Sequence, residues 1–182
     1  MKHFTGKLLV GALVVAVAAI GATPAGAAKD GTDRPFKAGG TGTNIIQPPE
    51  DCAFVPTPGV LVCDQAIELD FNGTHIGKSN YTGAGSITLY IFEPPCTTAG
   101  GGDGVPFESS VAVTIVAANG DELTADTNVT GCGDGITLAE PVGTYEITGG
   151  TGRFAGATGT GDLDGAALGT SLSNNWIGTI SY

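Results

Sequence analysis

The sequence predicts an all-β protein in which eight short antiparallel strands close into a barrel. Apolar residues occupy every second position in one segment after another, whereas helical periodicity is almost absent. Two Asn-Gly pairs lie between such segments, and such pairs favour tight hairpins. Closure into a barrel is expected because an open sheet of these strands would leave two exposed edges.

The strands are expected one after another along residues 60–182. Apolar and polar residues alternate in 67–71 and 87–91, which gives each segment one apolar face. In 111–116 both faces are apolar, so we expect that strand to be covered on both sides. Asn72-Gly73 and Asn119-Gly120 mark hairpin turns. Weaker patterns complete the set of eight at 74–82, 122–131, 144–148, 157–165 and 174–182.

A dense glycine cluster follows the expected strand 144–148. We interpret it as a structural turn, because glycine tolerates positive φ and the close approach of other backbone segments. Its arginine and phenylalanine are expected to pack over one end of the barrel, with the guanidinium bonded to carbonyls of the turn. The residues of this turn are Gly149, Gly150, Gly152, Arg153, Phe154 and Gly156.

Two segments precede the expected barrel domain, 60–182. Residues 1–27 have the features of a removed signal peptide, with a basic start, an apolar run over 8–20 and small residues before the expected cleavage site. That run is too short to span a bilayer, which needs about 20 residues. Residues 28–59 are rich in glycine and proline without a sustained period, and we interpret them as an extended N-terminal segment before the folded part. We therefore expect a secreted, extracellular protein.

The chain has four cysteines, all of them after the predicted signal peptide. In an exported protein this number predicts two disulfides, for which three connectivities exist. We favour Cys52–Cys63, which are close in sequence, with Cys96–Cys132, which flank a predicted hairpin. No CxxC pair is present and the mature chain has one histidine, His75, so no metal site is expected.

The charge of the chain makes nucleic acid an improbable partner. The net charge of −11 becomes −13 without residues 1–27, because that segment holds two lysines and no acidic residue. The remaining basic residues are scattered, whereas a phosphate backbone requires clustered lysine and arginine. Anionic membrane surfaces are disfavoured for the same reason, and we expect no membrane insertion after the signal is removed.

The run GGTGRFAGATG at 149–159, between TYEIT and TGDLDG, resembles the barrel signature of plant allene oxide cyclases and dirigent proteins. The segment THIGK at 74–78 and the closing WIGTISY are similar to segments of secreted bacterial proteins with an allene oxide cyclase-like barrel. The resemblance covers about residues 60–182 and implies a calycin-like barrel whose apolar interior positions a substrate without any cofactor. Outside the glycine turn no motif aligns residue by residue, so no catalytic residue carries over.

Other motifs and single residues suggest chemistry less strongly. Residues 150–155 fit the dinucleotide pattern GxGxxA, but the glycines that follow could not sustain the helix that this motif must open. His75 could act as a general base with Glu68 or Asp70, although a surface position on a strand is the more common role of such a histidine. The catalytic residues, if any exist, are not identified by the sequence.

Large aromatic residues on the expected strands are the candidates to line an interior pocket. If Tyr90, Phe92, Tyr145 and Trp176 point inward around an open space, they would contact a small hydrophobic ligand, and if they pack together they fill the core. The leading hypothesis is a secreted barrel that binds such a ligand without a cofactor. The alternatives are a cofactor-free isomerase or cyclase that uses the same interior, and a non-enzymatic extracellular structural or interaction protein with a filled core.

Overall fold

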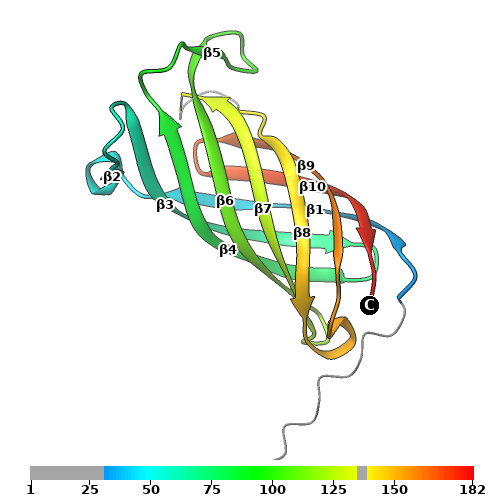
Figure 1. The fold of residues 1–182 in the computed structure, drawn as a ribbon. Coiled ribbons are helices and arrows are strands. Elements are labelled where there is room, and N and C mark those ends of the chain that lie inside the picture. Colours follow the sequence, from blue (N-terminus) through cyan, green and yellow to red (C-terminus); the bar gives the residue numbers. More distant parts are fainter. Residues whose placement is uncertain (1–30, 135–138) are drawn as a thin grey trace, which may run out of the picture.

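The structure, a computed structural model, describes residues 31–134 and 139–182 (Figure 1). The predicted signal peptide lies outside these residues. No helix within the described ranges has the length and apolar character needed to cross a bilayer. The elements in chain order are β1 (Arg34–Ile46), η1 (Pro49–Asp51), β2 (Ala53–Phe54), β3 (Val60–Gly73), β4 (Gly77–Tyr90), β5 (Cys96–Thr97), β6 (Asp103–Ala117), β7 (Glu122–Gly133), β8 (Val142–Gly150), η2 (Gly152–Phe154), β9 (Gly159–Leu168) and β10 (Ser171–Ile180).

Eight of these strands close into an antiparallel barrel. Neighbours follow the order β1-β10-β9-β8-β7-β6-β4-β3, and β3 pairs with β1 to complete the ring. Gly42 of β1 lies between Leu172 of β10 and Leu69 of β3, so one strand joins both ends of the sheet. The two-residue strands β2 and β5 add to β3 and β6 on the outside of the ring. The predicted fold class is confirmed.

The N-terminal boundary of the barrel differs from the prediction. Residues 28–59 were interpreted as an extended segment before the folded part, but β1 is a full barrel strand that pairs on both sides. The alternation is hidden in the sequence because three glycines, Gly39, Gly40 and Gly42, occupy the middle of the strand. Its two buried residues are Phe36 and Asn44, which lie too far apart in the sequence to indicate a period.

Two other sequence predictions also need correction. The strands expected at 74–82 and 87–91 are one continuous strand, β4, in which Gly83 and Gly85 interrupt the apolar pattern without ending the ladder. The number eight is therefore correct because β1 replaces the strand lost by this merger. The strand at 111–116 is part of β6, and it is not covered on both sides, since Ala112 on its outer face is exposed.

The half of the barrel nearer the chain's C-terminus is filled by aromatic side chains. Trp176, fully buried, stacks on Tyr145 with ring centroids 4.4 Å apart and planes at 17°. Phe36, Phe71 and Tyr81 meet the indole edge-on, with centroids 5.7–6.5 Å away. These five side chains occupy inward positions on five strands, namely β8, β10, β1, β3 and β4. The aromatic layer closes this part of the interior.

The connection between β8 and β9 covers the same end of the barrel, which we call the closed end (Figure 1). It contains the glycine turn singled out in the sequence, and its Phe154 is buried against Tyr182 with ring centroids 5.3 Å apart. Arg153 lies over the Phe154 ring, 4.7 Å from its centroid. The expectation that Arg153 bonds to turn carbonyls is corrected, because its Nε lies 3.6 Å from Asp121 Oδ2 in the β6–β7 hairpin.

Two disulfides join the predicted cysteine pairs. Cys52–Cys63 ties the segment after β1 to β3, and Cys96–Cys132 ties β5 to the end of β7. Both lie toward the opposite end of the barrel, which we call the open end. They therefore brace the rim that surrounds the cavity described next.

Candidate ligand cavity

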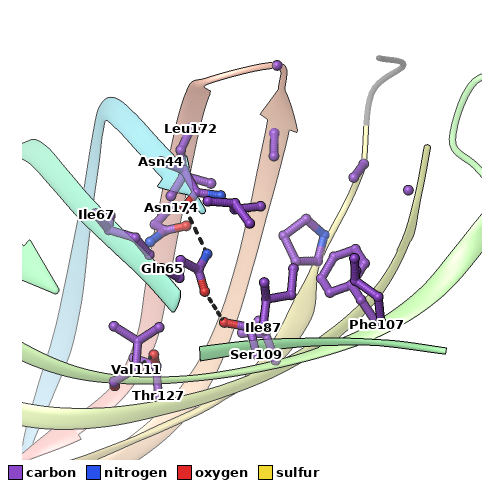
Figure 2. Close-up of a pocket in the computed structure, with 18 of the residues that line it drawn as sticks. Asn44, Gln65, Ile67, Ile87, Phe107, Ser109, Val111, Thr127, Leu172 and Asn174 are labelled. Carbon is purple, nitrogen blue, oxygen red and sulfur yellow. Dashed lines mark hydrogen bonds between the residues drawn. The ribbon is translucent and has the colours of Figure 1, made fainter. Parts of the chain in front are cut away.

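Between the aromatic layer and the open end, the barrel contains a cavity of about 340 Å³ (Figure 2). Its wall is mostly apolar, and five strands contribute to it through Ile67, Ile87, Val111, Leu163 and Leu172. The cavity reaches the surface at the open end, where the lining residue Ile46 is 40% exposed. Small-molecule sites typically measure roughly 300–1,000 Å³, so this volume falls at the lower end of that range.

A chain of hydrogen bonds crosses part of the apolar wall. The Ser109 hydroxyl donates to Gln65 Oε1 at 2.6 Å, and Gln65 Nε2 donates to Asn44 Oδ1 at 2.8 Å. All three residues are buried and occupy inward positions, on β6, β3 and β1. Because these two hydrogen bonds are made in sequence, they fix the orientation of the Gln65 and Asn44 amides (Figure 2).

Asn174 adds a further amide to this wall. It is 5% exposed, lines the cavity and lies on β10 between the inward residues Leu172 and Trp176. No hydrogen bond joins its side chain to any other residue in the described part of the chain. Figure 2 shows the amides of Asn44, Gln65 and Asn174 directed into the same part of the cavity.

None of these polar lining residues is among the site residues predicted from the sequence. A usable signal existed, because Gln65 and Asn174 replace an apolar residue at an inward position, in Cys63-x-Gln65-x-Ile67 and in Leu172-x-Asn174-x-Trp176. A polar residue in phase with an apolar period is buried when the strand forms, and burial of an amide requires a hydrogen-bond partner. Such positions deserved to be treated as candidate binding residues.

Two titratable side chains belong to the described lining. Tyr81 is buried, and its burial raises the pKa of the phenol well above the ordinary range, so the group stays protonated at neutral pH. Asp134 follows the last residue of β7 at the rim. A phenol of this kind donates a hydrogen bond but does not act as a base near pH 7.

None of the four aromatic residues expected to line a pocket contacts the cavity. Tyr145 and Trp176 fill the aromatic layer beneath it. Tyr90, at the end of β4, points outward and donates to Glu108 Oε2 at 3.0 Å. Phe92 lies beyond the strand and is 77% exposed. The apolar lining comes mainly from aliphatic residues, with Phe107 and Tyr81 as its aromatic members.

The candidate general base is also distant from the cavity. His75 lies in the hairpin between β3 and β4 at the closed end, where its Nε2 is 3.1 Å from the Pro35 carbonyl oxygen and its ring packs edge-on against Tyr182. Glu68 and Asp70 are exposed on the outer face of β3. The structure does not bring these three side chains together with the cavity. In the described residues no group of three or more potential ligand side chains is arranged to hold a metal ion.

Charge is distributed unevenly along the barrel axis. The four basic residues that the structure describes all lie at the closed end, namely Arg34, Lys37, Lys78 and Arg153. At the open end, every charged residue within the described ranges is acidic, and these residues include Glu50, Asp51, Glu93, Asp103 and Asp134. An anion that approaches the cavity therefore meets carboxylates of its own sign.

Exposed apolar side chains gather around the same end. Of the eight large apolar side chains that are exposed in the described residues, only Ile177 lies elsewhere. Phe92 is 77% exposed and Phe54 is 75% exposed. The remaining five are Ile45, Ile46, Ile91, Val142 and Leu168. Of these seven side chains, Ile46 also lines the cavity.

Comparison of the chain with protein-family models, with curated proteins and with solved structures finds no match. What is established about its architecture is the closed eight-stranded antiparallel barrel itself.

Proposed function

We propose that this protein binds one small hydrophobic molecule inside its barrel. The observation that carries the proposal is the open, mainly aliphatic cavity of about 340 Å³ above a closed aromatic layer. An apolar molecule that enters such a site leaves water and gains close contacts on all sides. Ile46 supports the same function, because it is exposed at the open end and also lines the cavity, so it offers an entering molecule an apolar contact.

The proposal includes export of the chain and a binding role without catalysis. Two disulfides are compatible with an oxidising compartment, and the predicted signal peptide would direct the chain there. A cofactor-free isomerase or cyclase would need a group in the cavity that exchanges protons at neutral pH. The inner part of the lining gives less support to that alternative, because Tyr81 stays protonated there and the other titratable side chain of the described lining, Asp134, lies at the rim.

We also propose that the barrel is of the allene oxide cyclase-like or dirigent-like type. The support is the glycine-rich connection between β8 and β9, which resembles the signature of those proteins, together with the closed eight-stranded ring. This kinship concerns the architecture and the use of an apolar interior. It assigns no reaction to the chain.

Fluorescence titration with N-phenyl-naphthylamine tests the binding function. This uncharged dye emits strongly only in an apolar environment, and we expect saturable binding of one molecule per chain. The variant Ala167→Phe places a ring at a lining position near the rim, so it should lose most of the signal. The matched control is Ala166→Phe, because Ala166 is the neighbouring residue on β9 and does not line the cavity. Equal signals from both variants, or no saturable signal from the wild type, would contradict the proposal.

A further inference from the structure

We infer that the cavity selects an uncharged ligand with a hydrogen-bonding end group, such as a carbonyl, carboxamide or hydroxyl, and that Asn174 holds this group. The inference rests on the proposed function and specifies its ligand class. It also predicts what the cavity rejects, namely a molecule of the same shape that ends in a carboxylate.

Asn174 has hydrogen-bonding capacity that no other described residue uses. A carboxamide has two donor hydrogens and an acceptor oxygen. Asn174 is 5% exposed and lines the cavity, and its side chain makes no hydrogen bond to another described residue. Because the residue lines the cavity, a molecule that occupies this space, whether water or a ligand, can bond to its amide. The cavity is the space from which a partner can approach it.

The neighbouring amides are already ordered. Asn44 and Gln65 lie on β1 and β3, which follow β10 around the barrel, and the bonds from Ser109 to Gln65 and from Gln65 to Asn44 fix them. The acceptor oxygens of Gln65 and Asn44 are therefore already used, and Asn174 bonds to neither of them. It lies beside this hydrogen-bonded chain, at the inward position of β10 that precedes Trp176 of the aromatic layer.

The charges of the barrel favour a neutral ligand. The wall contains no lysine or arginine among its lining residues, and the four described basic residues are at the closed end beyond the aromatic layer. A carboxylate beside Asn174 would be buried without a counter-charge, which is strongly unfavourable. It would also have to pass the acidic open end, where Asp134 belongs to the lining. A neutral group with the same shape meets neither obstacle.

The wall also sets the orientation of the ligand. Between Asn174 and the open end the wall is mostly apolar, through Leu172, Leu89, Val105 and Phe107, up to the exposed Ile46, and the polar Asn44 in this part of the wall is bonded to Gln65. A molecule with one polar end and an apolar chain matches this arrangement when the polar end enters first. The expected ligand is therefore a medium-length apolar molecule, neutral at the pH of its surroundings.

Decanamide and decanoate provide a direct test, because the two end groups have the same shape and differ in charge. Their dissociation constants are measured near pH 7 by displacement of N-phenyl-naphthylamine and by calorimetry. Decanamide should bind the wild type at least about tenfold more tightly than decanoate. Asn174→Leu should weaken decanamide binding by roughly tenfold, the loss expected for one hydrogen bond, while dye binding is retained. Asn174→Thr, which keeps a hydroxyl, should recover part of the affinity.

The matched control is Asn175→Leu, the same substitution at the next residue of β10. Asn175 is exposed on the outer face and donates to Asp164 Oδ2 at 3.1 Å, so decanamide binding should equal that of the wild type. If decanoate binds as tightly as decanamide, or if Asn174→Leu leaves the affinity for decanamide unchanged, the inference is overturned while the binding function stands. If neither the dye nor decanamide binds the wild type, the binding function fails as well.

Discussion

Replacing Tyr145 by phenylalanine should stabilise the protein. The Tyr145 hydroxyl is buried and has no hydrogen-bond partner among the described residues. Gly161 and Gly178 leave just enough room for it, since a Cβ at either position would come within 2.6 Å of the hydroxyl oxygen. The stack on Trp176, at 4.4 Å, depends on the ring and persists in the variant. The substitution therefore removes an unsatisfied polar group and little packing.

The expected gain follows from the cost of such a group. A buried donor without a partner costs about 1–3 kcal/mol, and the small void left by the hydroxyl offsets part of this gain. We expect Tyr145→Phe to raise the free energy of unfolding by about 1 kcal/mol. For a chain of this size that corresponds to a rise in Tm of about 2–4 °C, measured by thermal unfolding followed by circular dichroism.

The same residue gives a prediction about pH. Burial, with a smaller contribution from Asp162, raises the pKa of Tyr145 from 10.0 to about 12. Between these two values the unfolded chain loses the phenolic proton and the folded chain keeps it, so folding stability falls as pH rises through this window. Phenylalanine has no such proton. The stability advantage of Tyr145→Phe over the wild type should therefore grow above pH 10.

Tyr90→Phe is the control for the loss of a tyrosine hydroxyl. Its hydroxyl donates to Glu108 near the surface, so that variant should be neutral or slightly less stable than the wild type. A Tyr145→Phe variant that is less stable than the wild type by 1 kcal/mol or more would refute the reasoning. That result would mean that the hydroxyl makes a favourable interaction in the folded protein.

Two further predictions concern the glycine turn and the disulfides. Gly152→Ala should cost more than about 1 kcal/mol in unfolding free energy, because its φ is +56° and a Cβ would collide with the Asp121 carboxylate. Gly169→Ala, at the same φ but with no atom near its Cβ, should cost less, and equal losses in chemical denaturation would contradict the collision. Replacing both Cys96 and Cys132 by serine should cost about 4 kcal/mol, because this disulfide closes a loop with a sequence separation of 36. A midpoint of denaturation unchanged from that of the oxidised wild type would show that the bond does not constrain the unfolded chain.

The sequence predicted the barrel better than it predicted the site. Alternation and turn residues depend on local chemistry, so the fold class, the cysteine pairs and most strands could be predicted from the sequence. β1 was not, because its three central glycines give no period and its pairing partners, β10 and β3, lie far away in the sequence. Long-range pairing decides that this segment is a strand.

The site was harder to predict, because the alternation of apolar and polar residues shows which side chains point inward but not where they lie along the barrel axis. Trp176 and Leu172 both point inward, yet one belongs to the aromatic layer and the other to the cavity wall. Of the four aromatic residues expected at the cavity, Tyr145 and Trp176 pack on each other in the aromatic layer, and Tyr90 and Phe92 lie outside the barrel interior. The polar residues in phase with the apolar pattern, above all Asn174, were the better indicator.

A crystal structure of the protein grown with saturating decanamide tests the central claim most directly. The account predicts one ligand molecule inside the barrel, with its carboxamide within hydrogen-bond distance of Asn174 and its alkyl chain directed toward the open end. An interior filled by the protein's own side chains at saturating ligand would contradict it.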